Sequence, residues 1–543
     1  MEGVIGGQRR KSEITAEVYG SIRHSTVDTK ATLVSEADWD RSGPLNDDGQ
    51  DNAVNENTTL LGGGEPSKAS AGGGDGDSVS LLSEIPAIIV TLMINFMTAI
   101  PFGVAYFPLG WSSDASAVGE DDGGGEGGGI SGPFPLPGKE VLGIRMFLFA
   151  CITGQIALAL TSKFSSPVSV QLIENVPFYH ALASVVIAEQ GYGMEALSTM
   201  FFLFGLSSIV TGLMFYGLGK AGLGKVVYYF PSHVLVGFIG GIGVFIAISA
   251  TGVMTGEDFE FTADGVRHLA ANFGDFAPAL AFEIALRILM AVLKDENGKP
   301  KFGLLAPVFF ISIVPMFYIA LYLLGISMEE ATDAGYFFPA ASPEPTEVGG
   351  VVSDPSFLDG IFDGHILDTF RAVDFRTISW TAVVKSLGTV FGMSCFSVIN
   401  VPINIPAFAN ACDTDVDMNN ELMAHGYSNV LTGLFGGIQN VMTYSVSVLF
   451  YKSGGRSKAA QFALIVGTMI IFVFGVSTMP YIPKCMAGTL LLHIGVDLFM
   501  EGVYDSIEEY DKIEYGGVSI HSNHGSIILT PIYTTWRFSS RYI

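Results

Sequence analysis

Two apolar stretches of the sequence, 168–188 and 427–452, contain helix-starting residues near their middle. Pro177 suits the first position of a helix, and Thr443 or Ser445 suits the cap that precedes one. A helix that begins inside a membrane directs unpaired N–H groups and the positive end of its dipole toward the bilayer midplane. Both stretches therefore predict half-helices that bind an anion, although the second stretch alone also fits an ordinary helix with a slightly polar end.

Inside a membrane, non-helical backbone lies only where protein buries it or where it lines a cavity. We expect the first turns of the two half-helices to line one shared cavity. The residues expected there are Pro177, Phe178, Tyr179, Ser445 and Ser447.

Patterns that belong to other kinds of chemistry are incomplete in this sequence. Residues 219–225 match the spacing of a phosphate-binding loop, but Val226 replaces the Ser or Thr that would hold magnesium. The acidic run from Asp413 imitates a calcium loop, yet Met418 occupies the position of its glycine. We therefore predict no catalytic residue, no metal site and no cofactor, and hence no enzyme.

Ionisable residues in the apolar segments have structural interpretations. His180 could contact a substrate or act as a protonatable gate, but an interior histidine with satisfied hydrogen bonds is the commonest case. Glu283 and Arg287 lie four residues apart and are expected to pair across one helical turn. Glu174 lies at a segment edge and is expected to be solvated.

The composition is that of a polytopic membrane protein. Apolar residues make up 49% of the 543 residues, and the mean hydropathy is +0.45. The formal net charge of −26 lies largely in polar segments, which argues against binding of nucleic acid. The four cysteines form no CxxC pair, so neither a disulfide framework nor a zinc site is predicted.

Twelve apolar segments follow one another along the chain and predict an all-α membrane domain. Lys and Arg concentrate in alternate loops, which places the N-terminus in the cytosol by the positive-inside rule. The segments are roughly 85–108, 140–161, 168–188, 195–218, 226–251, 276–293, 303–325, 378–408, 427–440, 443–452, 459–478 and 481–500.

The broken segments are the third and the tenth, which are seven positions apart. This spacing is typical of a seven-plus-seven inverted repeat, in which two half-helices enter the membrane from opposite faces and meet at its midplane.

Four motifs resemble the sulfate permease (SulP) family of anion transporters over about residues 84–515. They are IPAIIVTLMINFMTAIPFGVAYFP, FPSHVLVGFIGGIG, ELMAHGYSNVLTGLFGG and YIPKCMAGTLLLHIGVDL. The wording around NVPFYHALASVV and SVLFYKSGG looks most like a fungal and algal branch of vacuolar-type members. The resemblance implies fourteen segments in two inverted repeats, with a cytosolic STAS domain after them.

Three features depart from that family. Its tenth helix commonly carries an anion-facing Arg where this chain has Val446, and a carboxylate of its eighth helix falls at or near Asn400. The resemblance implies that Val446, Asn400 and Asn404 face the cavity, and that proton coupling in the usual form is absent. We expect no counterpart of the family's last two helices and STAS domain, because no stretch after Glu501 is long or apolar enough to span a membrane. We thus expect about 12 of 14 segments within a membrane domain at 83–502, followed by an irregular or truncated tail at 503–543.

The resemblance implies secondary transport of a small inorganic anion, foremost sulfate, by alternating access. The alternatives are a non-transporting homologue or truncated regulatory protein, and an ion-coupled carrier of a neutral substrate, which Val446 would favour. The expected partners are the anion, membrane lipid, a second copy of the chain in a homodimer, and a sorting adaptor.

Residues 1–82 are polar and are expected to form a disordered cytosolic region. Within it, Glu56, Leu60 and Leu61 fit an acidic dileucine sorting signal. Together with the branch resemblance, this signal predicts a vacuolar or other endomembrane location rather than the plasma membrane.

Overall fold

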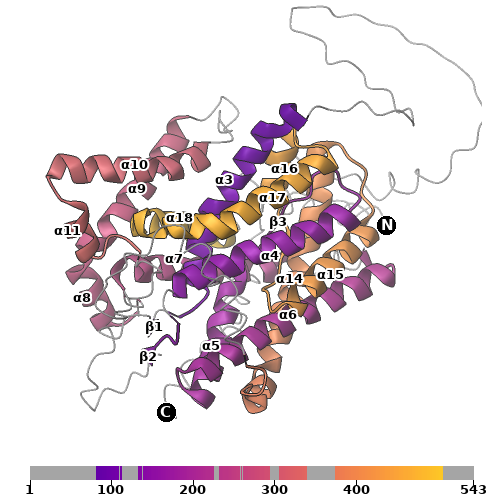
Figure 1. The fold of residues 1–543 in the computed structure, drawn as a ribbon, viewed down its shortest axis with the longest axis horizontal. Helices are drawn as coiled ribbons and strands as arrows, with labels where there is room; N and C mark the ends of the chain where they lie inside the picture. Colours follow the sequence, from indigo (N-terminus) through magenta and orange to yellow (C-terminus); the bar gives the residue numbers. More distant parts are fainter. Residues whose placement is uncertain are drawn as a thin grey trace, which may run out of the picture.

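The computed structural model describes a helical membrane domain within a longer chain (Figure 1). The described residues are 81–108, 110–112, 132–136, 139–224, 232–256, 259, 261–293, 305–338 and 374–505. The predicted sorting residues Glu56, Leu60 and Leu61 and most of the tail after residue 503 lie outside these ranges.

Each of the twelve predicted segments contains a helix. The helices of the first seven segments are α3 (Leu81–Ala105), α4 (Lys139–Thr161), α5 (Val176–Gln190), α6 (Met194–Lys220), α7 (Ser232–Thr255), α9 (Phe273–Val292) and α10 (Leu305–Leu324). The helices of the next five are α14 (Trp380–Cys412), α15 (Met418–Leu434), α16 (Tyr444–Lys452), α17 (Lys458–Phe474) and α18 (Lys484–Phe499). Among the described residues, five helices, namely α3, α4, α6, α10 and α14, are long and apolar enough to cross a membrane unaided.

The remaining elements are short. They are α8 (Ala263–Ala271), α11 (Met328–Asp333), the 3-10 helices η2 (Ile173–Asn175) and η4 (Gly475–Tyr481), the π-helix η5 (Met500–Asp505) and the two-residue strands β1 (Trp111–Ser112), β2 (Gly132–Pro133), β3 (Ser169–Val170) and β4 (Val441–Met442). Strands β1 and β2 pair in parallel.

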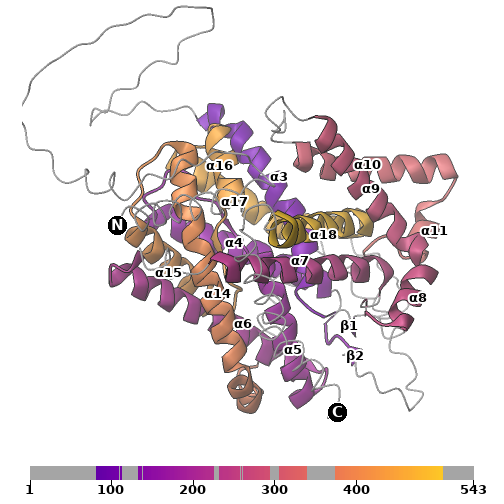
Figure 2. The same ribbon diagram turned by 180° about the vertical axis from the view of Figure 1, so that it is seen from behind.

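The helices gather on two sides of the molecule. Figures 1 and 2 show α8 to α11 together at one side and α6, α14 and α15 at the other. Helix α18 packs on α7 and α9, whereas α15 packs on α6 and α4. Helix α3 lies between the two sides. It packs on α4 and α17, and it also packs on α18 and α7.

The sequence prediction misplaced the ninth segment, for which 427–440 was expected. Helix α15 begins nine residues earlier, because the Asp417 side chain accepts a hydrogen bond from the Asn420 N–H and caps it. It ends at Leu434, just before Gly436 adopts a positive φ of 73°. The polar residues of its first turns disguised the helix, because Glu421 and His425 are buried within the protein rather than solvated.

Candidate substrate site at two half-helices

The two broken segments meet through a pair of short strands. Strands β3 and β4 are antiparallel, with Ser169 opposite Met442 and Val170 opposite Val441. After β3 the chain forms η2 and then α5, and after β4 it forms α16. Because the paired strands run in opposite directions and each leads into its own helix, α5 and α16 begin at opposite ends of this strand pair and extend away from it.

Side chains from neighbouring helices satisfy the non-helical backbone of the third segment. Gln155 of α4 donates from Nε2 to the carbonyl of Pro167 at 2.8 Å and accepts at Oε1 from the Ser169 N–H at 2.9 Å. The Ser447 hydroxyl of α16 accepts from the Val168 N–H at 2.9 Å. These bonds replace the helical ones that this stretch lacks, so the strand is stable inside the membrane domain.

The connector between α15 and α16 is held by an asparagine pair and a histidine. Asn429 donates from Nδ2 to the Asn440 carbonyl at 2.8 Å, and its Oδ1 accepts from the Asn440 N–H at 3.0 Å. His425 Nε2 accepts from the Met442 N–H at 3.0 Å, so the ring proton must lie on Nδ1, which is 2.7 Å from the Glu421 carbonyl oxygen. This neutral imidazole therefore supports the strand and is not available to a substrate.

The first half-helix begins at Val176, one residue before the predicted Pro177. The stretch 168–175 was expected to be extended, but its last three residues form η2. Phe178 is buried, and its ring lies 6.2 Å from that of Phe396 on α14, measured between centroids.

Tyr179 packs among aromatic residues of neighbouring elements. Its ring is fully buried and makes edge-on contacts with Tyr106, at 5.5 Å, and Phe204, at 5.1 Å. The side chain therefore packs α5 against α3 and α6.

The second half-helix begins at Tyr444, with Thr443 as its N-cap residue. The Thr443 side chain makes no capping hydrogen bond to the first turn of this helix. Ser445 is half-buried, whereas Val446 lies in the apolar core and Ser447 is fully buried against Val168.

Helix α14 packs against both half-helices, as the prediction for Asn400 and Asn404 requires. Asn404 is half-buried. The side chain of Asn400 lies outside the part that the structure describes.

Sequence reasoning missed several polar residues beside the half-helix ends. Asn175, the N-cap residue of α5, donates from Nδ2 to Gln439 Oε1 at 3.2 Å, and the Ser397 hydroxyl donates to the same oxygen at 2.6 Å. Gln171 Nε2, which was not predicted, and Oγ1 of Thr443, which was predicted only as a helix cap, are buried and have no partner among the described residues. Buried polar atoms are normally paired, so these two can serve a polar ligand or water. Their only signal in the sequence is their position flanking the breaks.

Glu174 lies inside the third segment rather than at its edge, where it had been expected. It belongs to η2, directly before the N-cap residue of α5, and its side chain is half-buried. Within the described part of the chain it forms no ion pair. A carboxylate in this position can stabilise the start of α5 or attract a cationic group of a ligand.

Two other predicted features have structural roles. His180 Nε2 lies 2.7 Å from the Ala105 carbonyl, and its ring packs 5.3 Å from that of Phe245, as expected of an interior histidine. The predicted pair of Glu283 and Arg287 is confirmed, with 2.6 Å between Oε1 and Nε.

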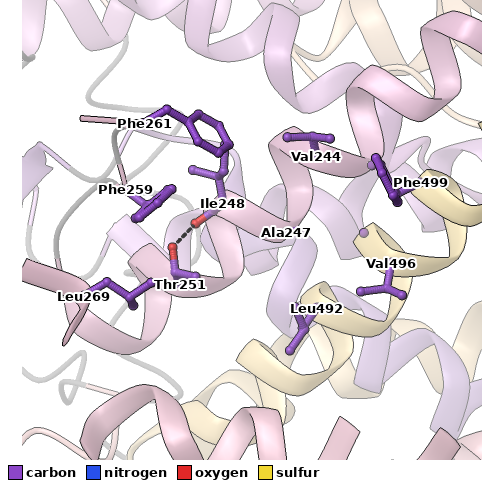
Figure 3. Close-up of a pocket in the computed structure, with 12 residues that line it drawn as sticks. Val244, Ala247, Ile248, Thr251, Phe259, Phe261, Leu269, Leu492, Val496 and Phe499 are labelled. Carbon is purple, nitrogen blue, oxygen red and sulfur yellow. Dashed lines mark hydrogen bonds between the residues drawn. The ribbon is translucent and has the colours of Figure 1, made fainter. Parts of the chain in front are cut away.

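A separate pocket lies between α7 and α18, away from the half-helices (Figure 3). It has a volume of about 280 Å³ and is lined mainly by apolar side chains, including Ile248, Phe261 and Phe499. Thr251 donates its hydroxyl to the Ile248 carbonyl at 2.7 Å rather than into the hollow. The pocket therefore offers no group suited to an anion.

Two transporters of known function are similar to this chain in sequence. The chain is 30% identical over 436 residues to the vacuolar basic amino acid transporter VSB1 of Saccharomyces cerevisiae. The aligned region covers 79% of this chain and 38% of that protein. It is 21% identical to the bicarbonate transporter BicA of Picosynechococcus, over 66% of this chain and 56% of that one. This chain thus spans less than two thirds of the length of both relatives.

Solved structures share the fold. The transmembrane domain of a cyanobacterial BicA matches with a TM-score of 0.51 at 16% identity, covering 83% of this chain and 95% of that one. The overall structure of SLC26A9 matches with a TM-score of 0.53 at 14% identity, covering 80% of this chain and 60% of that one. They confirm the predicted all-helical transporter fold.

A sequence model described as the Sulfate permease family matches residues 144–518. That family consists of transporters and not of enzymes, in agreement with the prediction. The chain therefore belongs to the sulfate permease family.

Proposed function

We propose that this chain is the membrane domain of a secondary transporter whose substrate presents a carboxylate to the N-termini of α5 and α16. The observations that carry the proposal are that the β3–β4 pair leads into both helix N-termini, that no side chain caps α16, and that a half-buried Glu174 precedes the N-cap residue of α5. Amino acids, and among them basic ones, are the substrates that fit best.

The charge at the site favours one negative group over two. Residues 176–179 and 444–447, the first turns of the half-helices, contain no Lys or Arg. Each helix N-terminus supplies about half a positive elementary charge, so two of them neutralise about one negative charge. A carboxylate is matched by this field, whereas a sulfate dianion would retain about one negative charge in a medium of low dielectric constant.

Glu174 adds a requirement for a cationic group. When ionised, it offsets the positive field of the two helix ends, so a simple anion would bind to a site without net positive charge. A solute that carries both a carboxylate and an ammonium or guanidinium group satisfies both parts. The similarity to a basic amino acid transporter supports the same class of substrate.

Uptake into proteoliposomes that contain the full chain tests this proposal. We expect labelled arginine to accumulate, and unlabelled lysine to compete while sulfate and bicarbonate do not. Uptake of sulfate without arginine would contradict the proposal. Uptake of none of these solutes by folded protein would favour a non-transporting homologue.

Replacing Glu174 tests the cationic part of the site. We expect Glu174→Gln to lower the affinity for arginine roughly tenfold or more, because a hydrogen bond to a charged group contributes about 1.5–3 kcal/mol. Glu189→Gln is the matched control, since Glu189 lies near the other end of α5 and pairs with Lys385. Equal losses in both variants would show that Glu174 does not bind the substrate.

Sulfate is the second candidate substrate, because the chain belongs to a family named for sulfate transport. Location is also a proposal: we place the protein in a vacuolar or other endomembrane with its N-terminus in the cytosol. The charge bias of the loops, the Glu56–Leu61 motif and the vacuolar relative support this placement.

A further inference from the structure

Four ionisable side chains meet between α9 and α18, remote from the half-helices. Glu283 and Arg287 come from α9, and His493 and Asp497 come from α18. Sequence spacing predicted only the pair on α9. The fold adds the other two residues. His493 lies 210 residues after Glu283 in the sequence.

Arg287 joins the two helices. Its Nε lies 2.6 Å from Glu283 Oε1, and its terminal nitrogen lies 2.6 Å from Asp497 Oδ1. The same nitrogen donates to the His493 carbonyl at 3.3 Å. One guanidinium therefore serves two carboxylates.

His493 also contacts both carboxylates, one with each ring nitrogen. Its Nδ1 lies 3.0 Å from Glu283 Oε2 and 3.2 Å from Oε1, and its Nε2 lies 3.5 Å from Asp497 Oδ2. A neutral imidazole has one N–H, so its other nitrogen would direct a lone pair at a carboxylate oxygen. Only a doubly protonated ring donates toward both carboxylates.

The charge count calls for one bound proton, and the ring geometry above assigns it to His493. Two carboxylates and one guanidinium leave one negative charge, and Glu283, His493 and Asp497 are only 4%, 5% and 8% exposed. An uncompensated charge is costly inside a membrane protein. One proton on the histidine makes the cluster neutral.

We propose that Glu283, Arg287, His493 and Asp497 form a proton-binding site, with the exchangeable proton held on His493. This site is distinct from the eighth-helix carboxylate that the family resemblance implies at or near Asn400.

The elements packed against α18 supply no competing charge within the described residues. From α7, residues 239–255 contain no ionisable group, and α10 places the Phe310 ring 5.6 Å from that of His493. Helix α3 carries Glu84, which accepts bonds from the N–H groups of Arg456 and Ser457. The side chains of η5 that the structure describes, Met500 and Val503, carry no charge. The remaining ionisable groups of α9 and α10 are Asp275, Tyr318 and Tyr322, which do not bond to the cluster in the described structure.

Loss of the proton would restore a net negative charge between α9 and α18 and weaken the contact that His493 makes with Glu283 across them. If the chain transports as proposed above, the transport rate then depends on pH through these helices. That consequence rests on the proposed function, whereas the proton-binding site itself does not.

Nitrogen NMR of the full chain in nanodiscs, with only histidine labelled, tests the site directly. At neutral pH we expect one doubly protonated ring whose signals vanish in His493→Gln and remain in the control His268→Gln. In Glu283→Gln or Asp497→Asn, the same ring should become singly protonated. A singly protonated His493 in the wild-type protein, or a doubly protonated one in both carboxylate variants, would overturn the proposal.

A transport measurement tests the consequence. In proteoliposomes with a pH gradient, we expect labelled arginine uptake by the wild-type protein to change several-fold with the gradient and uptake by His493→Gln to change little. The same pH dependence in His493→Gln would overturn the link between the site and transport. If the wild-type protein takes up no arginine, the proposed function fails, and the NMR result still decides whether the cluster binds a proton.

Discussion

At the scale of single residues, Ser445 and Ser447 differ sharply although they are two positions apart on α16. Ser447 is fully buried and accepts the Val168 N–H, whereas Ser445 is half-buried and makes no described hydrogen bond. Ser447→Ala leaves a buried donor unpaired, which costs about 1–3 kcal/mol, so we expect a lower thermal unfolding midpoint. Ser445→Ala should leave the midpoint unchanged and weaken substrate binding instead. Equal midpoints for the two variants would contradict this assignment.

Val446 lies in the apolar core near the start of α16, at the position where the resemblance to the family implies an anion-facing Arg. Val446→Arg supplies the cation that other family members commonly carry there, and we expect it to shift the preference from arginine toward sulfate, because it adds positive charge beside the two helix ends. Competition between the two solutes for uptake measures the shift. Val446→Leu keeps the position apolar and serves as the control. A similar shift in both variants would mean that packing, not charge, sets the preference.

At the scale of elements, the contact of α6 with α15 depends on glycine. A Cβ at Gly433 would lie 2.6 Å from the Gly205 carbonyl oxygen, closer than real contacts allow. Gly433→Ala must therefore separate the helices, and we expect a lower yield of folded protein and a lower unfolding midpoint. Gly217→Ala on α6 is the control, since nothing lies within 4 Å of its Cβ. Equal stability of both variants would contradict the close packing.

An ion pair links the ends of the same group of helices. Lys163 Nζ, after α4, lies 2.5 Å from Asp417 Oδ2, before α15, and this hydrogen bond lowers the pKa of Asp417 although partial burial opposes it. A lowered pKa stabilises the fold above the unfolded value of about 3.9, and the gain is lost as the pH falls through the folded value. Both side chains are largely exposed, so the gain is about 1 kcal/mol or less. Thermal unfolding of Lys163→Gln should match the wild type only in acid; a constant difference at every pH would contradict this.

At the scale of the whole molecule, the residues that break helices were visible in the sequence, whereas residues that meet through packing were not. Pro177 and the polar run before Ser445 predicted both half-helices, because local backbone chemistry determines where a helix starts. The start of α15 was missed, since its polar residues are paired inside the protein. The roles proposed for Glu174 and His493 were not predicted either, because each depends on neighbours that only the fold supplies.

The location of the protein in the cell is a separate prediction, and it depends on residues outside the described part of the chain. Adaptor recognition of an acidic dileucine signal needs both leucines, so Leu60→Ala with Leu61→Ala should move a fluorescently tagged protein from an internal acidic organelle toward the cell surface. Leu33→Ala with Leu45→Ala removes two leucines of the same arm outside this motif and should leave the location unchanged. Microscopy with organelle markers measures both. If the first pair of changes has no effect, the sorting signal is wrong, and the vacuolar location would then rest on similarity to a vacuolar relative alone.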